Sequence, residues 1–247
     1  MNYRFKYYFL SSLHPATIIL GTFLPILLGV LFTSSVIANV PDAYKTEVYL
    51  GMYFTFLPMI ITIYTLNGYI VVTANEKESN IPFRLKLFGI SEVEGFIYKI
   101  FANFLVIIFS VFIYTLVMKN KFDLQFNIIG NKYIILYIFL VSISYILFLI
   151  LSQSIVNIFK TSDRSMSAGL FIYFVLAIIS NMFGKLTLPS FLKKLSNYSP
   201  LTYITEEYVK VFKTEEYNYS PMIHCFIVFT GIVILLYYIS LKVGKNK

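Results

Sequence analysis

The residue types that carry out most enzyme chemistry are scarce in this sequence. Its 247 residues include two histidines, His14 and His224, and one cysteine, Cys225. Neither histidine belongs to an HExxH motif, which would place two zinc ligands and a general base on one helix face, and one cysteine excludes an intrachain disulfide. Glu206 and Glu207 form an acidic pair, but no nucleophile and base can be assembled around it. The sequence predicts no catalytic site, metal site or bound cofactor in this chain.

Groups that would couple transport to ATP or to protons are also missing from the expected places. No GxxxxGK[ST] pattern is present, because Gly184-Lys185 and Gly244-Lys245 lack the upstream glycine of a phosphate-binding loop. All 12 acidic residues fall outside the predicted spans, whereas carriers coupled to protons or ions usually bury a carboxylate. Any ATP chemistry must therefore come from another chain, and a stand-alone secondary carrier is the less favoured function class.

Composition predicts a membrane protein. Hydrophobic residues make up 58% of the chain and charged residues 13%, with a mean hydropathy of +0.75, whereas soluble domains carry about 25% charged residues. Six charge-free windows are each long enough to cross about 30 Å of hydrocarbon at about 1.5 Å per residue. We expect one all-α, polytopic transmembrane domain over residues 1–247. Its six transmembrane helices are predicted at Thr17–Ala38, Tyr49–Thr73, Phe96–Met118, Tyr133–Val156, Ser167–Phe183 and Met222–Leu241.

The first window has one alternative interpretation, a cleaved signal peptide, because Arg4 and Lys6 precede it. Its apolar run is much longer than the about 7 to 15 residues of a signal core, and five more windows follow. A transmembrane helix is therefore the preferred interpretation.

Lysine and arginine positions predict the orientation. With both termini inside, 11 of the 20 basic residues, including all three arginines, lie in or beside cytoplasmic segments. These segments are 1–16, 75–95, 157–166 and 242–247, and the longest outside segment is 185–220. The net charge of +8 then reflects bases facing anionic lipid and not nucleic acid. We expect a multi-pass protein of a cell membrane, in contact with the lipid bilayer and with cytoplasmic termini.

Two flanking segments are predicted to be helical without crossing the membrane. Residues 1–16 alternate bases with aromatic rings, which suits an interfacial helix, although a simple charged anchor flank explains the same pattern. Residues 185–220 carry apolar side chains at helical spacing and should form short amphipathic helices against the outer leaflet.

A burst of charge separates the second and third predicted spans. Seven of the 22 residues from Asn75 to Phe96 are charged, whereas the preceding 27 residues contain no charge. Pro82 suits the start of a helix, whose apolar positions follow at i, i+4 and i+7. These positions and their flanking bases are Phe83, Leu87, Ile90, Arg84 and Lys86. Such a helix can dock on a soluble partner or lie on the lipid surface.

At these residues the chain resembles the transmembrane subunits of ATP-binding-cassette (ABC) exporters of the type-2 permease class. That class carries an acidic E-x-E cluster and an R-L-rich coupling helix between its second and third spans. The matching residues are Glu76-Lys77-Glu78, Arg84-Leu85-Lys86-Leu87 and Ser91, with Ser79-Asn80 standing where the class often has Gly-Thr. A second match before the last span is Leu188-Pro189-Ser190-Phe191-Leu192, Pro200-Leu201-Thr202-Tyr203 and Glu206, with Lys210 where arginine is common.

The resemblance implies a half-size permease. Two such subunits, alike or different, would enclose the pathway, and two ABC ATPase subunits holding ATP and Mg would dock below. The implied ATPase-docking residues are Glu76, Glu78, Phe83, Arg84, Lys86, Leu87, Phe88 and Ile90. The second cytoplasmic connection offers further contacts at Lys160, Asp163 and Arg164.

The cargo is predicted from the polar residues within uncharged spans. Asn67, Asn103 and Asn181 are candidates for lining a pathway that suits amphipathic or hydrophobic cargo, although hydrogen bonds between helices would also explain them. The chain also resembles permeases of staphylococcal exporters of amphipathic toxin peptides, the phenol-soluble modulins. That resemblance implies peptide export, with drug or lipid-linked glycan export as the alternative.

Overall fold

The computed structural model describes residues 3–122, 124, 126, 129–159, 161–183, 188–213 and 216–245. It is 86% helical, and the described residues contain no strand. The prediction of an all-α polytopic membrane protein is confirmed.

Six helical stretches are long and apolar enough to cross a membrane, and each overlaps one predicted span. Their bounds are Ile19–Ile37, Tyr44–Glu78, Glu92–Phe122, Asn131–Ile158, Ser162–Ile179 and Ser220–Val243. Three begin or end four or five residues beyond the predicted bounds. The reason is that a charge-free window marks only the apolar part of a span, whereas backbone hydrogen bonding continues into the charged ends.

These spans and the short helices between them follow one another along the chain. The first five elements are α1 (Tyr3–Ser12), α2 (Pro15–Ile18), the π-helical segment η1 (Ile19–Phe23), α3 (Leu24–Ile37) and α4 (Asp42–Ile63). The next five are the π-helical segment η2 (Tyr64–Tyr69), α5 (Ile70–Glu78), α6 (Ile81–Leu87), α7 (Glu92–Phe122) and α8 (Asn131–Ile158). The last five are α9 (Ser162–Ile179), α10 (Ser190–Ser196), α11 (Pro200–Ile204), α12 (Glu206–Lys213) and α13 (Ser220–Lys245).

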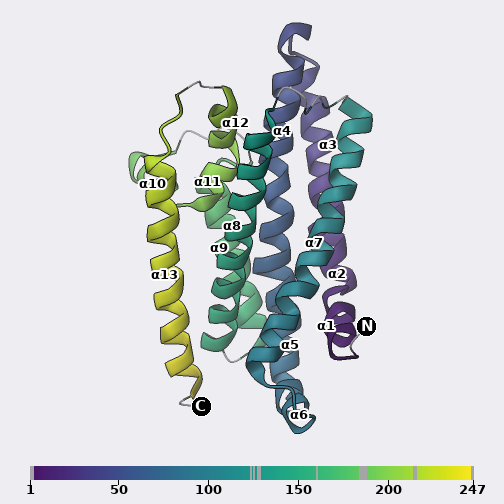
Figure 1. The fold of residues 1–247 in the computed structure, drawn as a ribbon, viewed down its shortest axis with the longest axis vertical. Helices are drawn as coiled ribbons and strands as arrows, with labels where there is room; N and C mark the ends of the chain where they lie inside the picture. Colours follow the sequence, from purple (N-terminus) through teal and green to yellow (C-terminus); the bar gives the residue numbers. More distant parts are fainter. Residues whose placement is uncertain are drawn as a thin grey trace.

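The long helices run side by side, and the short helices gather at the two ends of the bundle. Helices α1 and α6 and the end of α13 lie at one end, and α10, α11 and α12 lie at the other (Figure 1). Both chain ends are therefore found on the side of α6, as an even number of spans requires. The short helices predicted within residues 185–220 are present as α10 to α12.

The second span, made of α4, η2 and α5, forms the centre of the bundle. It packs against α3, α7, α8 and α9, and 78% of its most apolar stretch is buried, compared with 22% for α13. Ile60, Tyr64, Leu66 and Ile70 are fully buried there. Large side chains such as Phe109, Phe171 and Ile227 are instead exposed on α7, α9 and α13, as expected for helices that face lipid.

Many hydroxyl groups inside the bundle find partners within the protein, as a lipid environment demands. Among the described residues, the buried hydroxyls of Thr33, Tyr114 and Tyr173 have no such partner. Many of the others bond back to a carbonyl one turn earlier on their own helix. Thr62 Oγ1 lies 3.0 Å from the Pro58 carbonyl oxygen, and Thr65 Oγ1 lies 2.8 Å from that of Ile61. Between helices, Thr22 Oγ1 lies 2.7 Å from Tyr64 Oη and 2.8 Å from Ser110 Oγ, which links the first three spans.

The two π-helical segments are places where helices approach closely. A Cβ added at Gly21 in η1 would lie 2.5 Å from the Tyr64 ring, and one at Gly68 in η2 would lie 2.2 Å from Thr17 Cγ2. On the other side of η2, a Cβ at Gly169 of α9 would lie 2.4 Å from the carbonyl oxygen of Leu66. Small residues let transmembrane helices approach in this way, so three glycines set the spacing around η2.

Gly169→Ala should therefore destabilise the subunit, because the new methyl group meets backbone that cannot rotate away. Overpacking of this kind costs about 1 to 3 kcal/mol, which should lower the midpoint of heat unfolding of the detergent-purified protein. Gly231→Ala on α13 is the control, since a Cβ there meets nothing within 4 Å. Equal unfolding midpoints for the two variants would contradict the close packing at η2.

Candidate functional site

Helix α6 is a short helix with a defined start and end. Asn80, with φ 53°, ends the preceding helix in the left-handed conformation, and Pro82 lies in the first turn, as the sequence predicted. At the other end, Gly89 N–H donates to Lys86 O (3.0 Å) and Ile90 N–H donates to Leu85 O (3.0 Å), with Gly89 at φ 73°. This pair of bonds is a Schellman C-cap, which favours glycine at that position. The connection between α5 and α7 therefore has a defined backbone conformation at both ends of α6.

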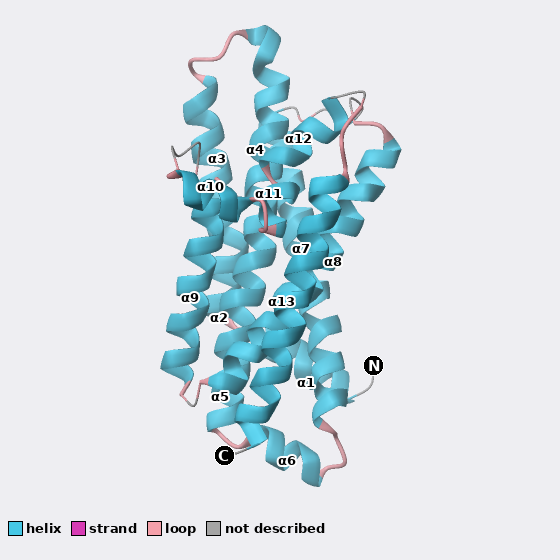
Figure 2. Ribbon diagram, turned by 90° about the vertical axis from the view of Figure 1, so that its left-hand side faces the viewer, coloured by secondary structure: helices cyan, strands magenta, loops and turns pink. Residues whose placement is uncertain are grey.

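Large apolar side chains are exposed on α6 and on the residue that follows it. Phe83, Leu87 and Phe88 are 64%, 73% and 77% exposed. Arg84 and Lys86 are exposed beside them, and α6 projects past the ends of the long helices (Figure 2). Exposed apolar residues grouped with bases indicate a binding surface for a partner or for lipid.

The prediction that Ile90 shares this surface is wrong. Its side chain is only 8% exposed, because α6 ends at Leu87 and the left-handed Gly89 turns the chain before helical spacing can reach residue 90. Phe88 takes the exposed place instead.

Glu76 also departs from its predicted place on a docking surface. Its Oε2 lies 2.5 Å from Nζ of Lys99, and the two side chains are 7% and 12% exposed. Tyr7 Oη donates to Glu76 Oε1 at 3.1 Å. We call Tyr7, Glu76 and Lys99 the stem cluster, because Glu76 and Lys99 join the end of α5 to the start of α7 on either side of α6.

Lys99 is nearly buried among groups of the protein. Its Nζ donates to Thr73 Oγ1 at 3.2 Å and lies 5.9 Å and 5.7 Å from the ring centres of Tyr8 and Tyr69, within cation–π range. Burial, followed by the negative charges of Glu76 and Glu94, raises the pKa of Tyr8 to about 12. The carboxylate that pairs with Lys99 is that of Glu76.

Glu78 is exposed, but its carboxylate bonds to another part of the same chain, the predicted cytoplasmic connection 157–166. Its Oε1 accepts a hydrogen bond from Ser162 N–H (2.6 Å) at the first turn of α9, where a carboxylate is favoured by the helix dipole. Asn75 Oδ1 accepts a second bond from Ser162 Oγ at 2.5 Å. The ends of α5 and the start of α9 are thereby joined.

The remaining predicted contacts of that connection are only partly described. Asp163 and Arg164 are exposed in the first turn of α9, on the same side as α6. Lys160 lies outside the described residues.

Helix α1 covers the Glu76–Lys99 pair and supplies Tyr7 to the stem cluster, a placement that the sequence did not reveal. Arg4 Nη1 lies 2.6 Å from Glu94 Oε1, and Tyr8 stacks on Tyr98 with ring centres 5.9 Å apart. Gly95 makes room for Tyr8, since a Cβ there would lie 2.5 Å from Tyr8 Oη. Alternating bases and rings in residues 1–16 predicted a helix, but nothing local to that segment identifies α7 as its partner.

The three asparagines predicted to line a pathway are not brought together. Asn67 is half-buried in η2. Asn103 is buried and donates to the Lys99 carbonyl oxygen of its own helix at 2.9 Å. Asn181 follows the last turn of α9, at the end of the bundle opposite Asn103, with φ 55°.

The fold and this site define a multi-pass membrane protein with an exposed amphipathic helix between its second and third spans. Residues 33–242 match the family described as ABC-2 family transporter protein, so the chain belongs to that family. Its members are transmembrane components of transporters that are generally not catalytic themselves. No curated protein and no solved structure matches the chain.

Breaking the stem cluster should destabilise the subunit more than breaking a surface ion pair of the same length. Lys99→Met leaves the Glu76 charge buried, which costs about 3 to 5 kcal/mol, and the double variant Glu76→Gln/Lys99→Met should recover much of that loss. Asp42→Asn removes an ion pair of 2.5 Å between Asp42 and Lys45, in which the Asp42 side chain is 93% exposed. This variant should change the stability little. Heat unfolding of the purified variants measures this difference. A double variant less stable than Lys99→Met would contradict the pairing.

Proposed function

We propose that this chain is the permease subunit of an ABC exporter, driven by ATP that a separate ATPase subunit hydrolyses. The observation that carries the proposal is the exposed surface of α6, formed by Phe83, Leu87 and Phe88 with Arg84 and Lys86 beside them. Family membership supports the docking of an ABC ATPase there over the alternative of a lipid-facing loop. It also favours this function over a stand-alone secondary carrier.

In this proposal, the stem cluster transmits the movement of the ATPase to the spans. ATP and Mg bind to the partner, and its closure displaces α6. Because the Glu76–Lys99 pair joins α5 to α7, both helices move with α6. The bond that Ser162 N–H donates to Glu78 Oε1 extends that movement to α9. Glu76 and Glu78 therefore take part in transmission within the chain and not in direct docking.

The pathway is proposed to lie between two permease copies. The interior of one subunit is packed with large side chains such as Tyr64, Tyr114 and Phe148. The void beside Asn103 and Gly68 has a volume of about 10 Å³, enough for a single water at most. We therefore place the pathway for a cargo larger than an ion at an interface with a second copy, of this chain or of a related one. Native mass spectrometry of the functional particle would oppose this if it found a single permease chain.

The end of the bundle that carries α6 is proposed to face the cytoplasm, in line with the excess of arginine and lysine in its short connections. A membrane-impermeant thiol reagent applied to intact cells should label Asn197→Cys and leave Ser79→Cys unlabelled. Ser79 and Asn197 are both exposed, so a difference in labelling reports the side of the membrane and not burial within the protein. The native Cys225 is buried and should not react. Labelling of Ser79→Cys from outside would reverse the orientation.

Variants on α6 should lose the ATPase without losing the fold. Arg84→Glu reverses a charge expected to meet acidic groups on the ATPase. Leu87→Ala should cost of order 1 to 3 kcal/mol of binding if it is a central contact. Copurification of the ATPase and export by cells are the measurements, and both should fall for each variant.

Lys194→Glu on α10 is the matched control, because it makes the same charge change on an exposed residue at the other end of the bundle. It should keep full ATPase binding. If the two α6 variants also keep full binding and export, α6 is a lipid-facing segment and the proposed function loses its main support.

The cargo is proposed to be amphipathic peptides, with drugs or lipid-linked glycans as the alternative within the same class. Uncharged spans and the resemblance to exporters of toxin peptides support this choice. Amphipathic helical peptides should stimulate ATP hydrolysis by the assembled transporter in lipid nanodiscs, whereas small hydrophilic ions should not. Stimulation by a lipid-linked glycan, without any by the peptides, would favour the alternative.

A further inference from the structure

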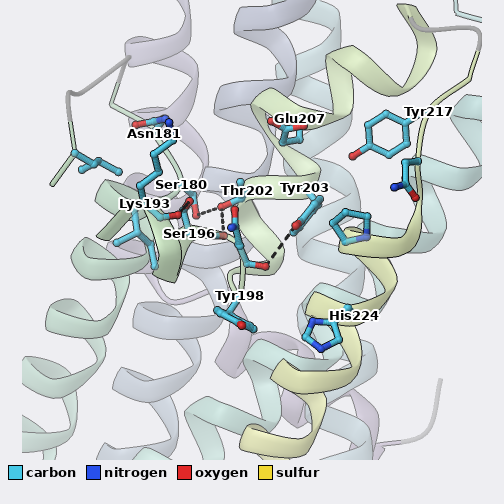
Figure 3. A pocket seen from close by; sticks show the side chains of 15 residues that line it. Ser180, Asn181, Lys193, Ser196, Tyr198, Thr202, Tyr203, Glu207, Tyr217 and His224 are labelled. Carbon is cyan, nitrogen blue, oxygen red and sulfur yellow. Dashed lines mark hydrogen bonds between the residues drawn. The ribbon is translucent and has the colours of Figure 1, made fainter. Parts of the chain in front are cut away.

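A large hollow lies far from α6 and has no part in the proposed docking. It has a volume of about 1,030 Å³ and is bounded by the end of α9, by α10 and α11, and by the starts of α12 and α13 (Figure 3). A cavity of this size exceeds what a single water or ion requires and falls in the range of small-molecule sites.

Aromatic rings and one carboxylate form one side of this cavity. Tyr203, Tyr217 and Glu207 line it near α12, and Tyr198 and His224 line it lower down with ring centres 6.0 Å apart. Tyr203 Oη donates to the Asn197 carbonyl oxygen at 3.4 Å, which helps to hold that ring in place.

The negative charge of Glu207 acts on both neighbouring phenols. Burial, and then the charge of Glu207, raises the pKa of Tyr217 to about 12. The pKa of Tyr203 is also raised, by burial first and then by Cys225 and Glu207. The rings and the carboxylate therefore share one electrostatic environment.

Several hydroxyl groups that line the cavity are bonded within the chain, and Lys193 also lines it. Ser180 Oγ lies 2.9 Å from Ser199 Oγ, and Thr202 Oγ1 donates to the Ser196 carbonyl oxygen at 2.8 Å. A sugar would need such hydroxyl groups to be available. Among the described residues, the bond of Glu207 is made through Oε1, which accepts a bond of 2.5 Å from Lys210 Nζ, a side chain 60% exposed. Such an exposed pair is weak, so a desolvated cation can compete with it.

We propose that this cavity binds the ammonium group of an amphiphile, with Glu207 balancing the charge and the Tyr203 and Tyr217 rings surrounding it. Aromatic rings beside a carboxylate are suited to an ammonium cation. The apolar body of the ligand fits beside Ile179, Leu188 and Pro221, which line the same cavity. This chemistry occurs in a lysine side chain of an amphipathic peptide and in the headgroup of phosphatidylethanolamine. The site does not depend on α6 or on an ATPase, so it can hold even if the proposed function fails.

The test uses the full chain in nanodiscs of phosphatidylglycerol and isothermal titration with hexyltrimethylammonium. Glu207→Gln and Tyr217→Leu should each weaken binding by about tenfold, the size expected for loss of a charge-assisted or cation–π contact. Glu47→Gln is the matched control, since Glu47 is an exposed carboxylate of α4 paired with Lys213 outside the cavity. Hexanol should bind equally to all of these proteins.

A fourth variant separates loss of the site from loss of the fold. Lys210→Gln removes the competing cation from an exposed position and should strengthen binding of hexyltrimethylammonium. Equal binding by the wild type, Glu207→Gln and Lys210→Gln would overturn the proposal. So would weaker binding by Lys210→Gln in a protein whose heat unfolding is unchanged.

Two further arms identify the natural source of the ammonium group. A lysine-containing amphipathic peptide should bind more tightly than the same peptide with acetylated lysines if the source is a peptide. If the source is lipid, phosphatidylethanolamine in the nanodisc should compete with the probe in the wild type and not in Glu207→Gln. Absence of both effects would contradict the proposal.

Discussion

Glu76 and Lys99 lie at the facing ends of the second and third spans, and the arrangement around α6 depends on their pairing. Each charge would be costly to bury alone. Together, with Tyr7 and Thr73 as hydrogen-bond partners, they hold α5 and α7 at a fixed separation. The Schellman cap at Gly89 then sets where α6 ends and the chain turns back. An exposed helix of seven residues thus gains a defined position from groups that are themselves buried.

The same cluster explains why α1 is part of the functional unit. Helix α1 supplies Tyr7 to Glu76, Tyr8 to the ring surface around Lys99, and Arg4 to Glu94. Without it, the buried pair would be open to water on one side. The segment expected to lie in the headgroup plane therefore also shields an ion pair, and its position is coupled to that of α7.

The fold could be predicted from the sequence because transmembrane helices obey local rules. Charge-free windows give the spans, and Pro82 gives the start of α6. The positions that failed depend on long-range partners or on a single turn. Ile90 was misplaced because Gly89 interrupts helical spacing, and Glu76 because Lys99 is its partner across the α6 connection. Nothing in the composition of residues 1–16 indicates that Arg4 meets Glu94, and Asn181 resembled any other asparagine near a span end.

The hydroxyl groups of the central span also bear on how the protein is made. Helices enter the bilayer in order during synthesis, so α4 and η2 arrive before α8 and α9, which later cover them. Thr62 and Thr65 bond to carbonyls one turn earlier on their own helix, and these bonds need no other span. The hydrogen-bond partners of these two hydroxyls are therefore already present when this span leaves the translocon. These two hydroxyls can therefore stay bonded in lipid until the neighbouring spans are synthesised.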